Sequence, residues 1–203
     1  MPSDNAKHFN PQAFQPIVSF IWSCADTLRD HYKKGEYPNI ILPLAVIRRI
    51  DAVLEGSKAQ VLATYEKYKD KDAQFLAPLL ISSDKGSGHC FYNTSPYTLT
   101  TLLDSPSHIR ANFENYLNSF SENVRDIIDR FDFFAQVKKL DDKGILYTLL
   151  QKFTSPKINF SIHATPNAQS LSNLGMGYVF EELIRKFNEE NNEEVSTSPR
   201  AKS

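Results

Sequence analysis

The sequence predicts an all-α fold, and three observations support this. Apolar residues recur at three- and four-residue steps along most of the 203-residue chain, which is the pattern of amphipathic helices. No segment shows the sustained alternation of apolar and polar residues that is typical of a strand, although a short pairing near residues 158–162 is compatible with the sequence. The chain has only 7 glycines, which argues against turn-dense β architecture and glycine-rich nucleotide loops.

The composition is that of an ordinary globular protein. Hydrophobic residues make up 41% and charged residues 23%, and the formal net charge of −1 gives no global basic field, so only a local patch could bind nucleic acid. Cys24 and Cys90 form no CxxC pair, and we expect reduced, partly buried thiols in a cytoplasmic protein. No signal peptide is visible, and the most apolar run, residues 40–46, is too short to cross a bilayer, so no membrane association is predicted.

A polar N-terminal tail is predicted over residues 1–10, followed by a helical bundle over residues 11–153. The first helix of this bundle is predicted from the apolar face that runs between Phe14 and Tyr32. Gly35 follows this face, and we expect it to end the helix as a left-handed cap.

The next segment, Ile40–Leu54, carries apolar residues all around its helical circumference, which predicts a central and mostly buried helix. Pro43 is expected in its first turn, where the missing N–H costs little. Arg48 and Asp51 have helical neighbour spacing, so the first interpretation is a partly buried ion pair that orients the helix. In a second interpretation, Arg49 emerges at an interface and binds a phosphate or a partner carboxylate.

The remaining bundle is predicted to consist of further short helices joined by polar turns. Ser121 is a predicted N-cap, and Gly144 is predicted to close the helix before it. Residues 154–173 are polar and irregular, which predicts a linker, and residues 174–192 are predicted to form a last helix. The other predicted helices cover residues 61–68, 75–80, 97–103, 109–120, 122–131, 134–140 and 145–153, with a loop over 82–96.

No catalytic, cofactor-binding or metal-binding residue is predicted. The glycine pair of Gly86-Ser87-Gly88 lacks the rest of a phosphate-binding motif, and a surface turn explains it better. The five histidines are scattered without metal-ligand spacing. Three lysines, Lys67, Lys69 and Lys71, lie near Tyr65 and Tyr68, but the periodicity places the aromatic rings on the core side and the lysines on a solvated face.

Four stretches, in order along the chain, resemble the N-terminal region of the modification (M, HsdM-like) subunit of type I restriction–modification systems, a family of adenine-specific DNA methyltransferases. The first stretch combines residues 20–29 with residues 37–44 and Arg48-Arg49-Ile50-Asp51. The others are Phe91-Tyr92-Asn93-Thr94-Ser95, residues 120–127 and residues 176–187. The resemblance implies an N-terminal helical bundle that precedes a Rossmann-like, S-adenosylmethionine-dependent catalytic domain.

The resemblance also implies partners. These are a specificity (S) subunit that reads the DNA sequence, a second M subunit, a restriction (R) subunit, and DNA within the complex. For DNA or partner contact we favour Lys33, Lys34, Arg48 and Arg49, which we expect to cluster around the first turn between helices. If these side chains touch DNA phosphates, removing their charge should weaken binding and flatten its salt dependence.

The family's catalytic motifs are not found in this sequence. Members of the family need a glycine-rich S-adenosylmethionine loop and an Asn-Pro-Pro-aromatic motif, whereas no two of the 11 prolines here are adjacent. We therefore expect that the chain alone binds no cofactor and methylates no DNA. A free-standing helical interaction or regulatory protein, with no link to methylation, is the alternative.

The last residues, 193–203, are expected to be a frameshifted polar tail. Family members continue after the last helix with Gly-Glu-His-Phe-Thr-Pro-Arg-Glu-Val, and a one-base shift in a coding string for that motif yields Val195 to Ser203 of this chain. The frameshift would lie near Glu194. A deliberately short domain with an unrelated polar tail is the other interpretation.

Overall fold

The computed structural model describes residues 9–166 and 168–197, with side chains to residue 193, and this part of the chain is mainly helical. Its α-helices are α1 (Gln15–Ala25), α2 (Pro38–Leu54), α3 (Lys58–Tyr68), α4 (Ala73–Ile81), α5 (Ile109–Asn118), α6 (Glu122–Arg130), α7 (Phe133–Asp142), α8 (Leu146–Phe153) and α9 (Asn173–Thr197). Short 3-10 turns are η2 (Pro11–Phe14), η3 (Asp26–Leu28), η4 (Lys34–Glu36), η5 (Glu55–Ser57), η6 (Thr101–Asp104) and η7 (Pro106–His108). No strand occurs among these residues, so the all-α prediction is confirmed.

The chain divides into two compact units. The terminal unit joins residues Met1–Leu42 to residues Pro156–Ser203, and the central unit covers Pro43–Ser155. The division places residues 11–42 of the predicted bundle in the same unit as the predicted linker and last helix. Of the predicted tails over residues 1–10 and 193–203, residues 1–8 and 198–203 lie outside the described residues.

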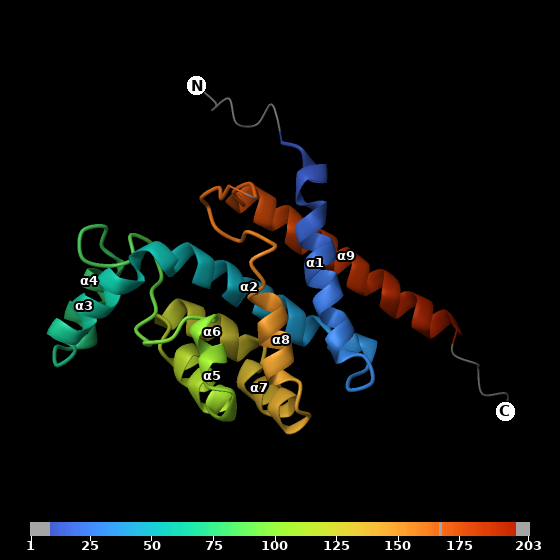
Figure 1. Cartoon of the computed structure of the whole chain (residues 1–203), viewed down its shortest axis with the longest axis horizontal. Coiled ribbons are helices and arrows are strands. Elements are labelled where there is room, and N and C mark those ends of the chain that lie inside the picture. The colour runs from blue at the N-terminus through green and yellow to red at the C-terminus, as the bar shows by residue number, and fades with distance from the viewer. Residues whose placement is uncertain (1–8, 167, 198–203) are drawn as a thin grey trace. The chain divides into compact units, whose positions relative to one another are not determined.

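The terminal unit is built on the packing of α1 against α9, which Figure 1 shows as two crossing helices. Both helices bury an apolar face with helical spacing: Ile17, Val18 and Ile21 on α1, and Val179 and Leu183 on α9. The segment predicted as a linker contributes to the same core, because Phe160 and Leu171 are fully buried. The helix predicted to end at residue 192 continues to Thr197.

Two details of the N-terminal region differ from the predictions. The left-handed residue after the first helix is Asp30, with φ of 70°, and Gly35 instead lies inside η4 without a positive φ. A short polar side chain such as aspartate tolerates this conformation better than most residues, so glycine was not required. The first turn of α2 contains Pro38, and Pro43 therefore lies in the interior of that helix.

The central unit packs α5, α6, α7 and α8 around a shared apolar core, shown in green to orange in Figure 1. Phe113, Tyr116 and Phe133 are almost completely buried, and the rings of Phe113 and Phe133 meet edge to face. Gly144 lies between α7 and α8, where the sequence predicted the end of a helix, and it takes a φ of 71°. The unit therefore derives its core from the predicted helical faces.

Three local predictions need correction. Residues 97–103 contain no α-helix and form only the 3-10 turn η6, because side chains of Thr98 and Thr101 bond to nearby backbone groups. The short pairing expected near residues 158–162 is found instead as an isolated bridge between Thr165 and Ala168. Ser121 does occupy the N-cap position of α6, but its hydroxyl accepts from the Tyr92 N–H instead of capping the helix.

Candidate functional site

A buried polar network around Asp51 fastens α2 to the rest of the central unit. Asp51 Oδ1 accepts hydrogen bonds from the Tyr116 hydroxyl at 2.8 Å and from the Leu99 N–H at 3.1 Å. Arg48 lies 3.9 Å from Asp51 Oδ2 and donates from Nε to the Phe153 carbonyl at 2.9 Å. Both charged side chains are less than 15% exposed, at 14% and 12%, which confirms the prediction of a partly buried ion pair.

Burial dominates the electrostatics of this network. It raises the pKa of Asp51, although the bonds from Tyr116 and Leu99 and the charge of Arg48 favour the carboxylate. Burial also lowers the pKa of Arg48, against the attraction of Asp51, and raises that of Tyr116 well above its ordinary value. A buried charge that loses its partner strongly destabilises the fold. This arrangement therefore serves to position the helices that carry it.

Lys58 and Asn93 extend the network to the loop between α4 and α5. Lys58 Nζ donates to Asn93 Oδ1 at 2.9 Å and lies 5.8 Å from the centroid of the Tyr116 ring. The Asn93 amide in turn donates to the Tyr116 carbonyl at 2.8 Å, and its Oδ1 also accepts from the Ser95 N–H at 2.8 Å. Burial lowers the pKa of Lys58 to about 8, against the attraction of Asp51. Lys58 and Asn93 therefore fix the position of the loop that contains residues 91–95, the second family-like stretch.

The family-like stretches contact one another in pairs. In the central unit, residues 91–95 lie against residues 120–127, because the Ser121 N–H donates to the Tyr92 carbonyl at 3.0 Å and an isolated bridge joins Asn93 to Phe120. In the terminal unit, α1 lies against α9, where the rings of Trp22 and Phe187 are 5.1 Å apart. The stretches thus form the contacts that define each unit.

The turn at Gly86 offers no phosphate site. Its N–H donates to the Ser82 carbonyl at 2.9 Å, and the Ser87 N–H donates to the Leu80 carbonyl at 2.8 Å, so both donors are used within the turn. A Cβ at Gly86 would lie 2.3 Å from the Leu80 backbone, so the glycine is needed for this close approach. The prediction of a turn is confirmed, but Gly86 and Ser87 are buried and do not lie at the surface.

The four predicted contact residues fall into two groups. Lys33 and Lys34 are exposed and belong to the terminal unit, where Lys34 Nζ meets Glu190 Oε2 at 2.6 Å. Arg48 and Arg49 belong to the central unit; Arg49 is 7% exposed, and burial lowers its pKa. Of the four predicted residues, the two lysines are therefore the exposed ones.

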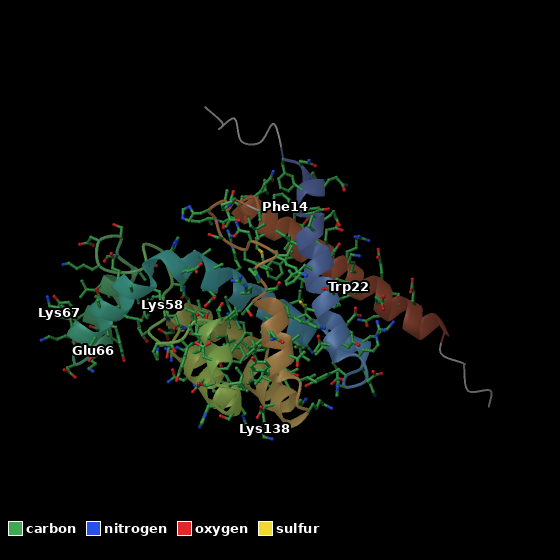
Figure 2. The ribbon with its side chains drawn as sticks, in the orientation of Figure 1. Phe14, Trp22, Lys58, Glu66, Lys67 and Lys138 are labelled. Atoms are coloured by element: carbon green, nitrogen blue, oxygen red, sulfur yellow. The ribbon has the colours of Figure 1, made fainter. Side chains whose placement is uncertain are left out.

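A cavity of about 280 Å³ lies beside Lys34 in the terminal unit. Its walls come from the end of α1, from η3 and η4, and from the second half of α9. The lining side chains are aromatic or charged: Trp22, Asp26, Arg29, Lys34, Tyr37 and Glu190, together with Ala25. Figure 2 labels Trp22 on the length of α1 that crosses α9.

The sequence did not indicate Lys58, the Asn93 side chain as its acceptor, or the residues that surround this cavity apart from Lys34. Asn93 lay inside a family-like stretch, but its bond to Lys58 spans 35 positions, and the Lys34–Glu190 pair spans 156. Because these partners lie so far apart in the sequence, no local sequence pattern indicates that they meet. The sequence shows the acidic pair Glu189-Glu190, but it does not indicate that Lys34 pairs with Glu190.

Cys24 is buried and Cys90 is exposed, and no disulfide joins them. Over the described ranges, no group of three or more His, Cys, Asp or Glu side chains could hold a metal ion. Within the same ranges, no helix combines the length and apolarity needed to cross a membrane.

The comparisons with known proteins identify one family. A family model for the HsdM N-terminal domain matches residues 17–153, which is most of the chain and includes three of the four family-like stretches. No curated protein and no solved structure matches the chain. The match confirms the resemblance seen in the sequence. The chain belongs to the HsdM N-terminal domain family.

Proposed function

We propose that this chain is the N-terminal helical part of the modification subunit of a type I restriction–modification, adenine-specific (N6) DNA methyltransferase, and that it serves subunit assembly and DNA contact. Membership of the HsdM N-terminal domain family is the observation that carries this proposal. The buried network around Asp51 supports it, because fixed helices provide rigid surfaces for partners. The partners proposed are the specificity subunit, a second modification subunit, the restriction subunit and DNA.

Among the predicted contact residues, Lys33 and Lys34 are the ones we retain for partner or DNA contact. Their exposure supports this, whereas Arg48 is bonded inside the central unit and Arg49 is buried. We assign Arg48 a positioning role. Cytoplasmic location follows from this function as part of the same proposal.

We further propose that these residues contribute nothing to S-adenosylmethionine binding or to methyl transfer. The glycine turn at Gly86 uses its N–H donors internally, and the sequence has no adjacent prolines. Calorimetric titration with S-adenosylmethionine should give no heat of binding, and incubation of the chain with methyl-labelled cofactor and DNA should transfer no label. Measurable transfer by the purified chain contradicts this part of the proposal.

Assembly is tested by co-purification. The chain is co-expressed with a tagged specificity subunit from the same restriction–modification system, and the tagged subunit is captured. We expect the chain in the captured fraction, and we expect Arg48→Ala to reduce capture only in proportion to any loss of folded protein measured by circular dichroism. Absence of the wild-type chain from that fraction favours the alternative of an interaction protein with no link to methylation.

A further inference from the structure

The cavity beside Trp22 has the side chains of a cation-binding site. Trp22 and Tyr37 supply aromatic surfaces, and Asp26 and Glu190 supply carboxylates. The Trp22 ring already has a cation against it, because Lys186 Nζ lies 5.4 Å from the ring centroid. Aromatic rings attract cations through their negative faces, and carboxylates pair with guanidinium groups through two parallel hydrogen bonds.

The charges around the cavity favour a basic ligand over an acidic one. The segment from Asp26 to Tyr37 carries three acidic and three basic side chains. On α9, the stretch from Glu181 to Glu193 carries five carboxylates and two cations. The two cations that line the cavity are paired with carboxylates, Arg29 with Asp26 at 2.8 Å and Lys34 with Glu190 at 2.6 Å. The cavity lining itself carries two carboxylates and two cations, so the surplus negative charge lies on the neighbouring part of α9, where it repels DNA phosphates and attracts basic groups.

The size of the cavity suits one side chain. Sites for drug-sized ligands measure roughly 300–1,000 Å³, and this cavity of about 280 Å³ falls just below that range. A planar guanidinium can lie against an aromatic wall while it bonds to a carboxylate, which a compact ammonium does less well. The Lys34–Glu190 pair is half exposed, with side-chain exposures of 49% and 37%, so an incoming guanidinium can compete for Glu190 at little cost.

We propose that the cavity lined by Trp22, Tyr37, Asp26 and Glu190 accepts an arginine side chain from a basic segment of a protein partner. This proposal deepens the assembly role given above and rests on it. Glu190 binds the guanidinium, Trp22 and Tyr37 contact its planar face, and Lys34 competes with the ligand for Glu190. Of the two contact roles proposed above for Lys34, partner or DNA, the cavity favours the first, in which Lys34 tunes the binding of a protein partner.

Trp22 is the only tryptophan in the chain, so its fluorescence reports directly on the cavity. The probe is a hexa-arginine peptide, titrated into the full chain at about 0.1 M salt, where exposed charges are partly screened. We expect a saturable change in Trp22 emission. A hexa-glutamate peptide and a short DNA duplex, titrated in the same way, should produce no saturable change.

Three variants make the test specific. Glu190→Gln should weaken hexa-arginine binding about tenfold, because it removes the carboxylate that receives the ligand. Lys34→Ala should tighten binding by about threefold or more, because it removes the competing ammonium. Glu189→Gln, which removes the same charge one position earlier on α9 but outside the cavity lining, should change affinity by less than about twofold. A gain of affinity in Lys34→Ala cannot arise from a loss of folded structure.

Several results would overturn the inference. Equal effects of Glu189→Gln and Glu190→Gln show binding to general negative charge, and saturable binding of the DNA duplex shows a phosphate site. No response of Trp22 to hexa-arginine also rules the cavity out. If the chain still co-purifies with the specificity subunit in any of these cases, the cavity proposal fails while the proposed function stands. If hexa-arginine binds with the expected variant pattern but the specificity subunit does not, the proposed function fails instead.

Discussion

The central and terminal units use charged side chains in opposite ways. In the central unit, Asp51 and Arg48 are mostly buried; Asp51 accepts from the Tyr116 hydroxyl and Arg48 donates to the Phe153 carbonyl. In the terminal unit, the Lys34–Glu190 pair is half exposed at the edge of a cavity. Removing one partner of a buried pair is expensive, whereas a surface pair contributes little to stability. Charges that look equivalent in the sequence therefore divide into those that hold helices in place and those available to a partner.

The largest expected effect is loss of the Asp51 carboxylate. Asp51→Ala leaves the Tyr116 hydroxyl, the Leu99 N–H and the charge of Arg48 without their acceptor, so we expect the free energy of unfolding to fall by about 3–5 kcal/mol. Urea denaturation followed by circular dichroism measures this. The exposed Asp126→Ala on α6 is the control, with a change below about 0.5 kcal/mol. Equal effects of the two variants would remove the distinction between buried and exposed carboxylates.

The next effect concerns the close contact between the two ends of the chain. A Cβ at Gly175 would lie 2.5 Å from Phe14 Cε1, whereas a Cβ at Gly177 meets nothing within 4 Å. We expect Gly175→Ala to destabilise the terminal unit by about 1–3 kcal/mol through overpacking. Gly177→Ala, two positions along α9, should be neutral or stabilise by up to about 1 kcal/mol, because alanine favours helix. Thermal unfolding of both variants shows whether the packing of α9 on the N-terminal region holds the unit together.

A smaller effect is expected from the titration of Lys58, which makes the free energy of unfolding depend on pH. Its pKa falls from 10.5 to about 8 in the folded chain, so between these values the unfolded chain binds the proton and the folded chain does not. The contribution of Lys58 to stability is therefore unfavourable below pH 8 and improves as the pH rises through this window. Between pH 7 and pH 9.5, we expect the free energy of unfolding of the wild type to rise by about 1–2 kcal/mol relative to that of Lys58→Met, after allowance for solvent screening. Urea denaturation of both proteins at pH 7 and pH 9.5 checks this, and parallel curves would contradict it.

The smallest effect is expected at the surface pair of the terminal unit. Lys34→Ala should change the free energy of unfolding by less than about 0.5 kcal/mol, because the pair is half exposed. Chemical denaturation at low and high salt measures this change and its screening. A loss greater than about 1 kcal/mol would mean that Lys34 has a structural role like that of Arg48.

Local relations in the structure were predictable from the sequence, and distant ones were not. The Arg48–Asp51 pair follows from a three-residue spacing on one helix, and the positive φ of Gly144 follows from its place after a helical run. Tyr116 donates to Asp51 across 65 positions, and nothing in the order of residues indicates that contact.

The differences from the predictions have two origins, packing between distant segments and the range of residue types that a backbone conformation accepts. The cavity around Trp22 requires the two ends of the chain to meet, which periodicity does not reveal. Asp30 replaced Gly35 as the left-handed residue because more than one residue type can adopt that conformation. The apolar faces fixed which helices form, while packing decided where they end, as for α9.

The most direct test of the assembly role is the dissociation constant between this chain and the specificity subunit, measured by sedimentation velocity on the purified proteins. We expect a defined complex with a dissociation constant of about 1 μM or tighter, the strength of a specific interface. Two proteins that sediment independently at concentrations of about 100 μM would contradict the account.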